Sequence, residues 1–359
     1  MVALVEPMCT GWEHEEVNAG LLKLIDNTTE DRISYYGDRG QVQAVSSIYH
    51  SDKVNFTEIE KIPEKEIRET DKALAIYIKI LQTVVKECRP DAVFILSGDR
   101  PCMMAVQISA RIYPKVKFLM ILHAILDPKL GHTSSCAKIM RKSVGIPNLS
   151  YVTYSPFARK LFGKRGVDNI LFLHHPYIEA VKNIDRRNKH DKHRIGIIGA
   201  CANRNALRFV EAVGHEPDIA DKYEFCIASR GSGIFKGVEN AKIVLSEFDR
   251  DNIETFMKQI DYLFLPYGRN DYRIAASGVL WDAISNKVPC LAYDSRYIGY
   301  YQKRHNIGIM GDSLSAMLQV LKDIEDGKEE NVEYFINMDA LERENQKVIR
   351  EILEWRTKR

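Results

Sequence analysis

The chain has 359 residues, of which 45% are hydrophobic and 28% are charged, and its formal net charge at pH 7 is +2. This length allows two domains with separate hydrophobic cores, and the near-neutral charge gives no compositional case for binding nucleic acid. No apolar run approaches the ~18 residues of a membrane-spanning helix, and residues 1–16 lack the basic start and long apolar core of a signal peptide.

The first half alternates short apolar strands with amphipathic helices. Strands are expected at 2–5, 33–36, 53–62, 91–97, 116–123, 151–155 and 170–173, and helices at 15–25, 67–87, 103–113, 135–144 and from 156 onward. Because strands and helices alternate, we predict a mostly parallel sheet with both faces covered.

Residues 179–193 are polar and highly charged, and we interpret them as a linker. The same alternation then restarts, with strands expected at 194–199, 223–229, 242–245, 262–265 and 288–292, and helices at 205–213, 251–259, 277–285 and 313–326. The tail also has helical periodicity, so the sequence predicts two α/β halves of similar size.

The seven cysteines are an odd number and are scattered along the chain, at positions 9, 88, 102, 136, 201, 226 and 290. They form no CxxC pair and no cluster with histidines. This pattern fits reduced thiols in a cytoplasmic protein and argues against a structural zinc site.

The stretch from 263 to 293 carries the clearest functional signal. A short strand leads through a loop to a helix that opens with Ser277 and Gly278, at the carboxyl ends of the strands. Free N–H groups and the helix dipole can hold a phosphate there, Ser277 can cap the helix and donate its hydroxyl, and Gly278 lets a ligand approach the backbone. Asp282, about one turn on, could accept hydrogen bonds from sugar hydroxyls. A plainer interpretation is that Ser277 only caps the helix and Asp282 is solvated.

The order of elements from 194 to 326 resembles the donor domain of GT-B-type glycosyltransferases, particularly the large retaining family of bacterial cell-surface glycan transferases. The resemblance is strongest over IVLSEFDRDNIETFMKQIDYLFLPYGRNDYRIAASGVLWDAISNKVPCLAY. It implies two Rossmann-like domains with mostly parallel sheets facing a central cleft. We expect an acceptor-binding domain at 1–178, a nucleotide-sugar-binding domain at 194–335, and a helix at 336–359 that crosses back to the first domain.

The resemblance also assigns the donor site. Asp282, in WDAISNKVPCLA, stands where the family usually has the glutamate that binds ribose, and Ser277-Gly278 matches the diphosphate cradle. Arg204 is the nearest basic residue after the strand-end glycine, and it is expected to stabilise the departing diphosphate. The expected donor-binding residues are Gly199, Arg204, Arg230, Tyr267, Arg273, Ser277, Gly278 and Asp282.

Two positions depart from the family pattern. Ile274 stands where the family often has a second glutamate, and Ala200 stands where it has an arginine directly after the glycine. Asp271 and Arg273 could substitute for the missing glutamate, by proximity alone. These departures favour an alternative, a binding or scaffold protein without turnover.

In the first half, His123 ends an apolar strand in MILHAILD, where many family members have a histidine near the reacting sugar. The resemblance makes His123 a catalytic candidate beside Arg204, although a structural role is the plain alternative. Gly11 and His14, in the first strand–helix connection, and Asp99, in SGDRP, are expected to bind the acceptor.

Other chemistries lack their signatures. Asp249-Arg250-Asp251 has the form of a metal-binding DxD motif, but it directly precedes a predicted helix, and we interpret Asp251 as its cap. No metal or other cofactor is expected, because a helix dipole and arginines can neutralise the diphosphate. No GxGxxG, GxxxxGK[ST] or GxSxG occurs, which leaves dinucleotide, P-loop and serine-hydrolase interpretations unsupported.

Basic residues cluster between 138 and 165, with Phe157 and Phe162 nearby. They are Lys138, Arg141, Lys142, Arg159, Lys160, Lys164 and Arg165. Such a face could bind an anionic membrane at which a lipid-linked acceptor lies, and a solvated face is the equally open alternative.

Together these features predict a metal-independent glycosyltransferase. It would move a sugar from a nucleotide-diphosphate sugar, its co-substrate, to a glycan or glycolipid, with retention implied by the family. A sugar-nucleotide epimerase of the same fold is a further alternative, which would need carboxylates around the sugar. The loss of the glutamate at Ile274 weakens it.

Overall fold

The computed structural model describes residues 1–60, 70–123, 133–178, 191–247, 252–269, 271–272, 275–328 and 338–356. The chain divides into two compact units. The first comprises Met1–Ile178, Arg273–Ala276 and Met338–Arg359, and the second comprises Glu179–Tyr272 and Ser277–Asn337.

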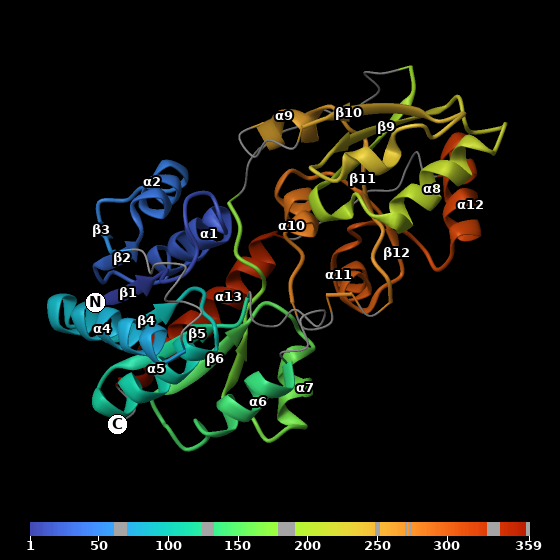
Figure 1. Ribbon diagram of the computed structural model, residues 1–359. Coiled ribbons are helices and arrows are strands. Elements are labelled where there is room, and N and C mark those ends of the chain that lie inside the picture. The colour runs from blue at the N-terminus through green and yellow to red at the C-terminus, as the bar shows by residue number, and fades with distance from the viewer. Residues whose placement is uncertain are drawn as a thin grey trace. The chain divides into compact units, whose positions relative to one another are not determined.

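The first unit is built on a seven-stranded, all-parallel sheet in the order β3-β2-β1-β4-β5-β6-β7 (Figure 1). Its strands are β1 (Val2–Val5), β2 (Ile33–Gly37), β3 (Val54–Glu58), β4 (Ala92–Ile95), β5 (Lys117–Ile121), β6 (Leu149–Thr153) and β7 (Ile170–Phe172). Its helices are α1 (Glu15–Asp26), α2 (Arg39–Ile48), α4 (Thr70–Cys88), α5 (Arg100–Ile112), α6 (Thr133–Arg141), α7 (Ala158–Gly163) and α13 (Met338–Leu353), which ends in the short turn η5 (Glu354–Arg356).

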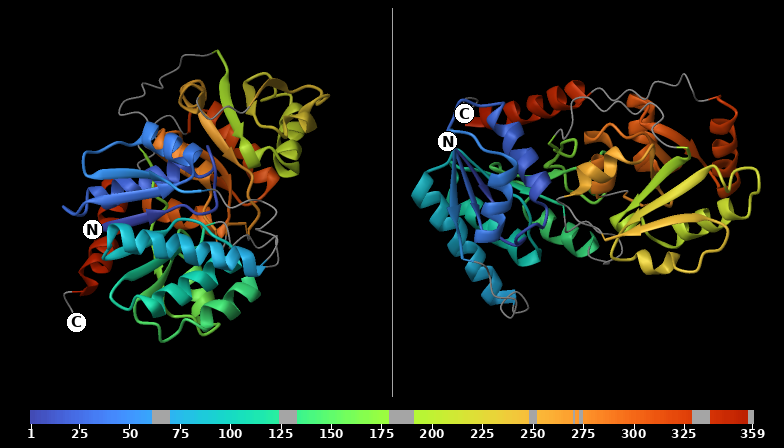
Figure 2. Two further views of the ribbon diagram at one scale, coloured as in Figure 1. Left: turned by 60° about the vertical axis from the view of Figure 1, so that its left-hand side comes forward. Right: turned by 90° about the horizontal axis from the view of Figure 1, so that it is seen from above.

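The five central strands β1, β2, β4, β5 and β6 are buried at every residue. Because successive side chains point to opposite faces, both faces of the sheet are covered there. Alternate residues such as Val93 and Ile95 join one core with apolar residues of α4, α5, α6 and α7. On the other face α13 packs beside α1, and the right-hand view of Figure 2 separates the two layers. Asn345 ties α13 to the segment after β7, because its side chain bonds both the N–H and the C=O of His174.

The second unit has a six-stranded, all-parallel sheet in the order β10-β9-β8-β11-β12-β13. Its strands are β8 (His193–Ile198), β9 (Tyr223–Ala228), β10 (Lys242–Ser246), β11 (Tyr262–Leu265), β12 (Cys290–Tyr293) and β13 (Gly308–Gly311). Its helices are α8 (Arg204–Gly214), α9 (Ile253–Lys258), α10 (Gly278–Ser285), α11 (Arg296–His305) and α12 (Leu314–Glu325), with short turns η2 (Gly199–Cys201) and η3 (Ser232–Phe235).

Phenylalanines join α8 to this sheet. The ring of Phe209 on α8 stacks on Phe264 of β11 at 4.3 Å between centroids, and it meets the edge of Phe225 on β9 at 6.0 Å. All three side chains are at most 1% exposed. Burying three aromatic rings contributes strongly to the stability of this core.

In both sheets the strand order reverses once, between β1 and β4 and between β8 and β11. In open parallel sheets such a switch point leaves a crevice at the carboxyl ends of the strands, where ligands bind. The prediction of two Rossmann-like units with parallel sheets is confirmed, and a binding site is expected at these two edges.

Three elements were not predicted: α2, α11 and β13. Only Gln41, Ala44 and Val45 are buried in α2, so its sequence has little apolar periodicity. The aromatic run of α11 is interrupted by Gly299, and β13 is four residues long with a glycine at each end. Residues 67–69 of one predicted helix, residue 251 of another and most of the predicted linker lie outside the described residues.

Two further findings concern the whole described chain. All seven cysteines are free, as predicted. None of the described helices combines the length and the apolar character needed to cross a bilayer.

Candidate functional site

Three histidines gather at the carboxyl end of the first sheet. The ring centroid of His123, which follows β5, lies 4.5 Å from that of His14 and 5.6 Å from those of His175 and Tyr154. Each of these residues comes after a different strand, so the shared sheet edge brings them together. Nδ1 of His123 is buried and has no hydrogen-bond partner among the described residues.

This environment favours the neutral form of the His123 and His14 imidazoles. Burial, together with the neighbouring His14 and His175, lowers the pKa of His123 well below its usual value. Burial also lowers the pKa of His14. Nδ1 of His175 lies 2.8 Å from the carbonyl oxygen of Pro176, which can only accept, so this nitrogen carries the proton. Neutral imidazoles at a sheet edge can accept a proton or a hydrogen bond from a hydroxyl group.

A buried carboxyl lies beneath this cluster. Glu6 directly follows β1, is 1% exposed, and accepts hydrogen bonds from Ser97, Asn18 and the N–H groups of Met8 and Cys9. Burial raises the pKa of Glu6, and the hydrogen bonds oppose that rise. These bonds connect Glu6 to the loop after β1, and its carboxyl is almost completely shielded from solvent.

Cys9 links that carboxyl to the histidines. Its Sγ lies 3.4 Å from Nδ1 of His14 and 3.5 Å from Oγ of Ser97. Burial and the nearby Glu6 raise the pKa of the thiol, which therefore stays protonated near neutral pH.

Of the predicted acceptor residues, His14 joins this cluster and Gly11 lies three residues before it in the same loop. Asp99 has a structural task, because its carboxylate caps α5 by accepting the N–H of Cys102 at 3.0 Å. Burial raises the pKa of Asp99. The acceptor-binding roles of these three residues stay predictions.

In the second unit, α10 begins where the sequence predicted. Oγ of Ser277 accepts the N–H of Leu280 at 3.1 Å, which confirms the predicted cap. The same oxygen lies 2.5 Å from the hydroxyl of Tyr267, and Ser277 is fully buried, so this hydroxyl is already bonded within the protein. Gly278, by contrast, is exposed, and a Cβ placed on it would meet no atom within 4 Å.

The loops after β8 and β9 lie beside this helix start. Gly199 begins η2 with φ +51°, a conformation that favours glycine, and η2 contacts α10. The carbonyl of Gly199 accepts the hydroxyl of Ser229 at 2.9 Å, which holds the exposed Arg230 in the adjacent loop. One edge of the second sheet therefore brings together Gly199, Tyr267, Ser277 and the backbone before Arg230.

The remaining donor candidates differ in exposure. Arg204 is exposed in the first turn of α8, which Asn203 caps. Asp282 is 6% exposed. Burial and, to a smaller extent, the charge of Asp282 raise the pKa of the Cys201 thiol to about 12. Arg273 and Ile274 lie outside the described residues, as does the 249–251 motif.

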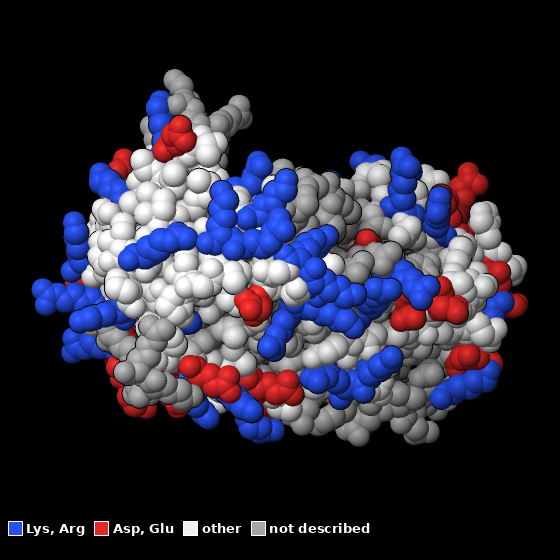
Figure 3. All heavy atoms as spheres, turned by 90° about the horizontal axis from the view of Figure 1, so that it is seen from below, with Lys and Arg blue, Asp and Glu red and all other residues white. Residues whose placement is uncertain are grey.

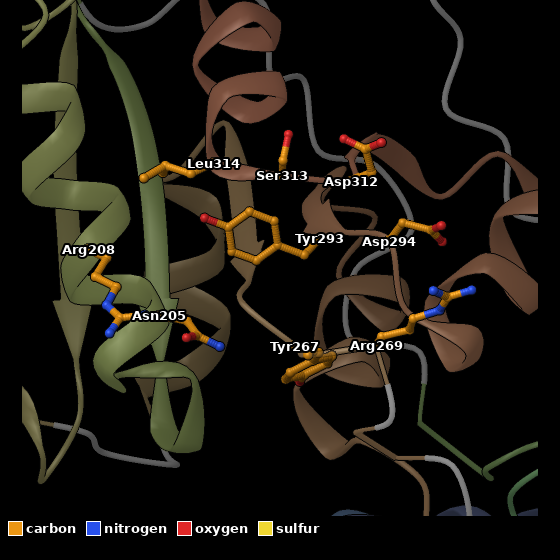
Figure 4. A pocket seen from close by; sticks show the side chains of 10 residues that line it. Asn205, Arg208, Tyr267, Arg269, Tyr293, Asp294, Asp312, Ser313 and Leu314 are labelled. Carbon is orange, nitrogen blue, oxygen red and sulfur yellow. The ribbon is translucent and has the colours of Figure 1, made fainter.

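A cavity of about 620 Å³ opens beside these residues, between the starts of α8 and α12 (Figure 4). Figure 4 shows Arg208 on one side and Arg269, Asp294 and Asp312 on the other. Among the described lining residues, Tyr267 is the one that the sequence assigned to the donor site. The described lining residues are Asn205, Arg208, Tyr267, Gly268, Arg269, Tyr293, Asp294, Asp312, Ser313 and Leu314.

Sequence reasoning missed four residues of the first unit's cluster, Glu6, Cys9, Tyr154 and His175. Three of them come at or just after the end of a predicted strand, which is the rule that selected His123. Applying this rule to every strand would have found Glu6, Tyr154 and His175. Across the described ranges, no group of three or more His, Cys, Asp or Glu side chains is placed to hold a metal ion.

The predicted basic cluster lies on the surface of the first unit. Lys and Arg side chains gather across the face seen from below (Figure 3), and all seven predicted residues are exposed. The guanidinium of Arg111 bonds the carbonyl of Lys142, and the side chain of Arg141 would lie 3.7 Å from a Cβ on Gly166, so α5, α6 and the end of α7 adjoin. Phe162 is fully buried and belongs to the core.

Comparison with known proteins gives no match in sequence: no family model matches the chain, and neither does any curated protein. The UDP-GlcNAc 2-epimerase from Neisseria meningitidis, solved with UDP-GlcNAc, is similar in structure, with 13% identity, a TM-score of 0.60, and coverage of 98% of this chain and 99% of its own. The glycosyltransferase from Rickettsia africae has 12% identity, a TM-score of 0.62, and coverage of 98% and 92%.

A second UDP-GlcNAc 2-epimerase, from Methanocaldococcus jannaschii, has 15% identity, a TM-score of 0.55, and coverage of 97% of this chain and 99% of its own. At such identities the likeness shows the fold alone. Glycosyltransferases and UDP-GlcNAc 2-epimerases share one architecture, and the alignments run through both units. The chain therefore has the GT-B fold, as the resemblance implied.

Proposed function

We propose that the protein is a glycosyltransferase that moves a sugar from a nucleotide-diphosphate sugar to a glycan or glycolipid acceptor without a metal. The second unit would bind the donor and the first unit the acceptor. Catalysis would consist of holding the anomeric carbon against an acceptor hydroxyl while fixed positive charge stabilises the departing diphosphate. Retention at the anomeric carbon is part of this proposal and rests on the family resemblance.

One observation carries the proposal: the start of α10. Its first residue, Gly278, is exposed and has open space where a side chain would be, at the switch point of a parallel sheet. The cap by Ser277 leaves neighbouring N–H groups at the positive end of the helix dipole for an anion. The loops of Gly199 and Arg230 adjoin it, so backbone and guanidinium groups can surround a diphosphate.

In the first unit, His123 is suited to the acceptor side of the reaction. Its lowered pKa keeps the ring neutral, and its unpartnered Nδ1 can take a hydrogen bond. We propose that His123 orients the acceptor hydroxyl or the transferred sugar. Arg204, exposed at the start of α8, would stabilise charge on the leaving diphosphate.

The alternative of an epimerase is supported by the likeness to UDP-GlcNAc 2-epimerases of the same fold. Epimerisation needs a carboxyl or a similar group that can exchange a proton with the sugar. In the first unit, Glu6 and Asp99 follow strands, but both are engaged with backbone N–H groups. This engagement favours transfer over epimerisation.

The donor site is tested by binding. UDP, GDP, dTDP and CMP, with their common sugars, are added to the protein and the melting temperature is measured, because a ligand that binds only the folded state raises it. We expect one diphosphate to raise it, and we expect Gly278→Val to weaken that ligand about 10- to 100-fold by blocking several charge-assisted hydrogen bonds.

Gly163→Val is the matched control, because a Cβ placed on Gly163 would also meet no atom within 4 Å, and its φ is not positive. It should leave nucleotide binding unchanged. If no nucleotide shifts the melting temperature, or if both variants weaken binding equally, the donor site is not at α10.

Turnover separates the remaining alternatives. Incubation of the binding nucleotide sugar in deuterated water, followed by mass spectrometry, distinguishes three outcomes. A transferase releases the nucleoside diphosphate, faster when an acceptor is present. An epimerase changes the sugar and introduces deuterium into it. A protein that binds the nucleotide sugar but leaves it intact under every acceptor condition is the non-catalytic alternative.

We further propose that the basic surface binds anionic lipid at the cytoplasmic face of a membrane, where a lipid-linked acceptor would lie. Exposed Ile112 and Val144, at 49% and 46%, adjoin its arginines and could enter the headgroup layer. Each basic residue near an anionic surface contributes about 1 kcal/mol, so Arg159→Glu with Lys160→Glu should release the protein from phosphatidylglycerol vesicles. Lys236→Glu with Lys303→Glu, exposed in the second unit, is the control.

A further inference from the structure

Among the described residues, Trp12 is the most exposed of the large hydrophobic side chains, at 59%. It lies in the loop between β1 and α1, at the carboxyl end of the first sheet. An indole that stays in water lacks the large favourable free energy that its burial would give. Large apolar side chains that stay exposed often mark binding sites. Exposure alone does not identify a site. The second observation is how hydrogen bonds hold the backbone on either side of Trp12.

That backbone is held on both sides of Trp12. The amide Nε2 of Gln41, on α2, donates to the carbonyl of Gly11 at 2.9 Å and to the carbonyl of Glu13 at 2.5 Å. The loop is also closed on itself, because the N–H of Glu13 donates to the carbonyl of Thr10 at 3.2 Å and the N–H of Thr10 donates to the carboxylate of Glu13 at 3.0 Å.

The Gln41 side chain, which acts as a clamp on this loop, is itself held in place. Gln41 is fully buried, and its Oε1 accepts from the hydroxyl of Tyr35 at 2.9 Å and from the amide of Asn18 at 3.2 Å. Gly40 lets α2 approach the loop, because a Cβ there would lie 3.0 Å from Cα of Gly11. A buried network thus fixes the main chain of a residue whose own side chain it leaves in water.

The surroundings of Trp12 suit a sugar. Gly11 has open space at its Cβ position, and His14, two residues after Trp12, lies against His123. The ring faces of a pyranose carry C–H groups that stack on an indole, while its hydroxyls bond to imidazoles. A fixed aromatic face reduces the ordering cost of binding, because its position is set before the ligand arrives.

We propose that Trp12 is a stacking platform for a pyranose ring of the acceptor, displayed by the Gln41 clamp beside His14. This inference rests on the proposed function, because it names the acceptor chemistry of the first unit. It makes Trp12 a binding residue and Gln41 a positioning residue.

The test is saturation-transfer NMR with methyl glycosides of glucose, galactose and mannose, which reports on the sugar and not on the indole. We expect transfer to the ring C–H protons of at least one glycoside. In Trp12→Ala the affinity should fall about tenfold, the range of a lost aromatic contact, and Trp12→Phe should retain most of it. Ile234→Ala, an exposed apolar residue of the second unit, is the control.

Gln41→Met tests the positioning role, because methionine has a similar volume but cannot donate to the two carbonyls. Provided its melting curve stays cooperative, it should weaken sugar binding while Trp12 is still present. Equal binding by wild type, Trp12→Ala and Gln41→Met would overturn the inference. So would the absence of binding to every glycoside.

Failure here is distinguishable from failure of the proposed function. Nucleotide binding belongs to the second unit, so Trp12→Ala should leave the nucleotide-induced melting shift intact. A protein that binds nucleotide but shows no Trp12-dependent sugar contact would refute this inference and leave the donor site standing. A protein that binds glycosides through Trp12 but binds no nucleotide would refute the proposed donor site and leave this inference standing.

Discussion

The two units share one architecture, but different chemical groups lie at the carboxyl ends of their sheets. In the first unit, side chains dominate the edge: His14, His123, His175 and Tyr154 meet within 5.6 Å between neighbouring ring centroids, over a buried carboxyl network. In the second unit the edge is opened by glycines and a capped helix start, and arginines stand exposed around it.

Under the proposed function, this difference would suit the two sheet edges to two kinds of substrate. A diphosphate is a compact anion that backbone N–H groups and guanidinium groups bind well, which requires exposed main chain. A sugar hydroxyl is neutral and directional, and it is better met by fixed imidazole and aromatic groups. We therefore expect substitutions in the two units to affect different steps.

The largest effect is expected at His123. His123→Ala should lower turnover about 100-fold or more, the usual contribution of a positioned acid–base or hydrogen-bonding group. Nucleotide affinity should stay within error of wild type, because the residue belongs to the first unit. Initial rates at saturating donor measure the first quantity. If His123→Ala retained full turnover, the first unit's cluster would be structural.

At the other edge, Asp282→Asn should weaken the nucleotide about tenfold by removing a charged acceptor from a sugar hydroxyl. A sharper test compares the loss of affinity for two ligands. If Asp282 binds the ribose, the loss should be larger for a ribonucleoside diphosphate than for its 2′-deoxy analogue. An equal loss for both ligands would place Asp282 away from the 2′-hydroxyl.

A third prediction concerns the rigidity of the first unit. Gln41→Met should lower the free energy of unfolding by about 2 kcal/mol, because the carbonyls of Gly11 and Glu13 and the groups on Tyr35 and Asn18 lose their partner. Denaturant titration measures it. Gln43→Met, at an exposed position of the same helix, is the control and should cost little. Comparable losses in both variants would mean that the network contributes nothing particular.

The smallest effect is a pH dependence. His14 and His123 have pKa values lowered by burial, so below about pH 6.5 the unfolded chain binds protons that the folded chain does not. Stability should therefore fall as pH decreases from 7 to 5.5, with a loss of about 1 kcal/mol from His123. The lowered pKa of His14 acts in the same direction.

His123→Asn should flatten this dependence, whereas His50→Asn, at an exposed position, should not. Denaturant midpoints at several pH values provide the measurement. The raised pKa of Glu6 acts in the opposite direction, since its contribution is lost as pH rises, so the two variants must be compared at each pH. An identical slope in both variants would mean that His123 titrates normally in the folded protein.

Much of the fold was predictable because parallel strands buried on both faces are continuous apolar runs, as in 92–95 or 117–121. The elements missed were those whose stability comes from tertiary contacts, such as α2, whose buried Gln41 bonds Gly11, Glu13 and Tyr35. In the second unit the cap at Ser277 and the open Gly278 could be read from residue types, because helix starts have local chemistry.

The first unit's site was harder to predict. His123 was found through a strand end, but its neighbours His14, Tyr154 and His175 come from three other loops, which only the sheet order brings together. The exposed side chain of Trp12 could not be foreseen, because a tryptophan is ordinarily buried and its clamp lies 29 residues away in Gln41. Sequence shows which residues end a strand, and topology decides which strands are neighbours.

The division of labour between the units is the central claim, and calorimetric titration of the binding nucleoside diphosphate tests it most directly. Wild type, Gly278→Val and His123→Ala are titrated in parallel. We expect Gly278→Val to lose most of the affinity and His123→Ala to retain all of it. Loss of affinity in His123→Ala with none in Gly278→Val would contradict this division, because it would place the nucleotide in the first unit.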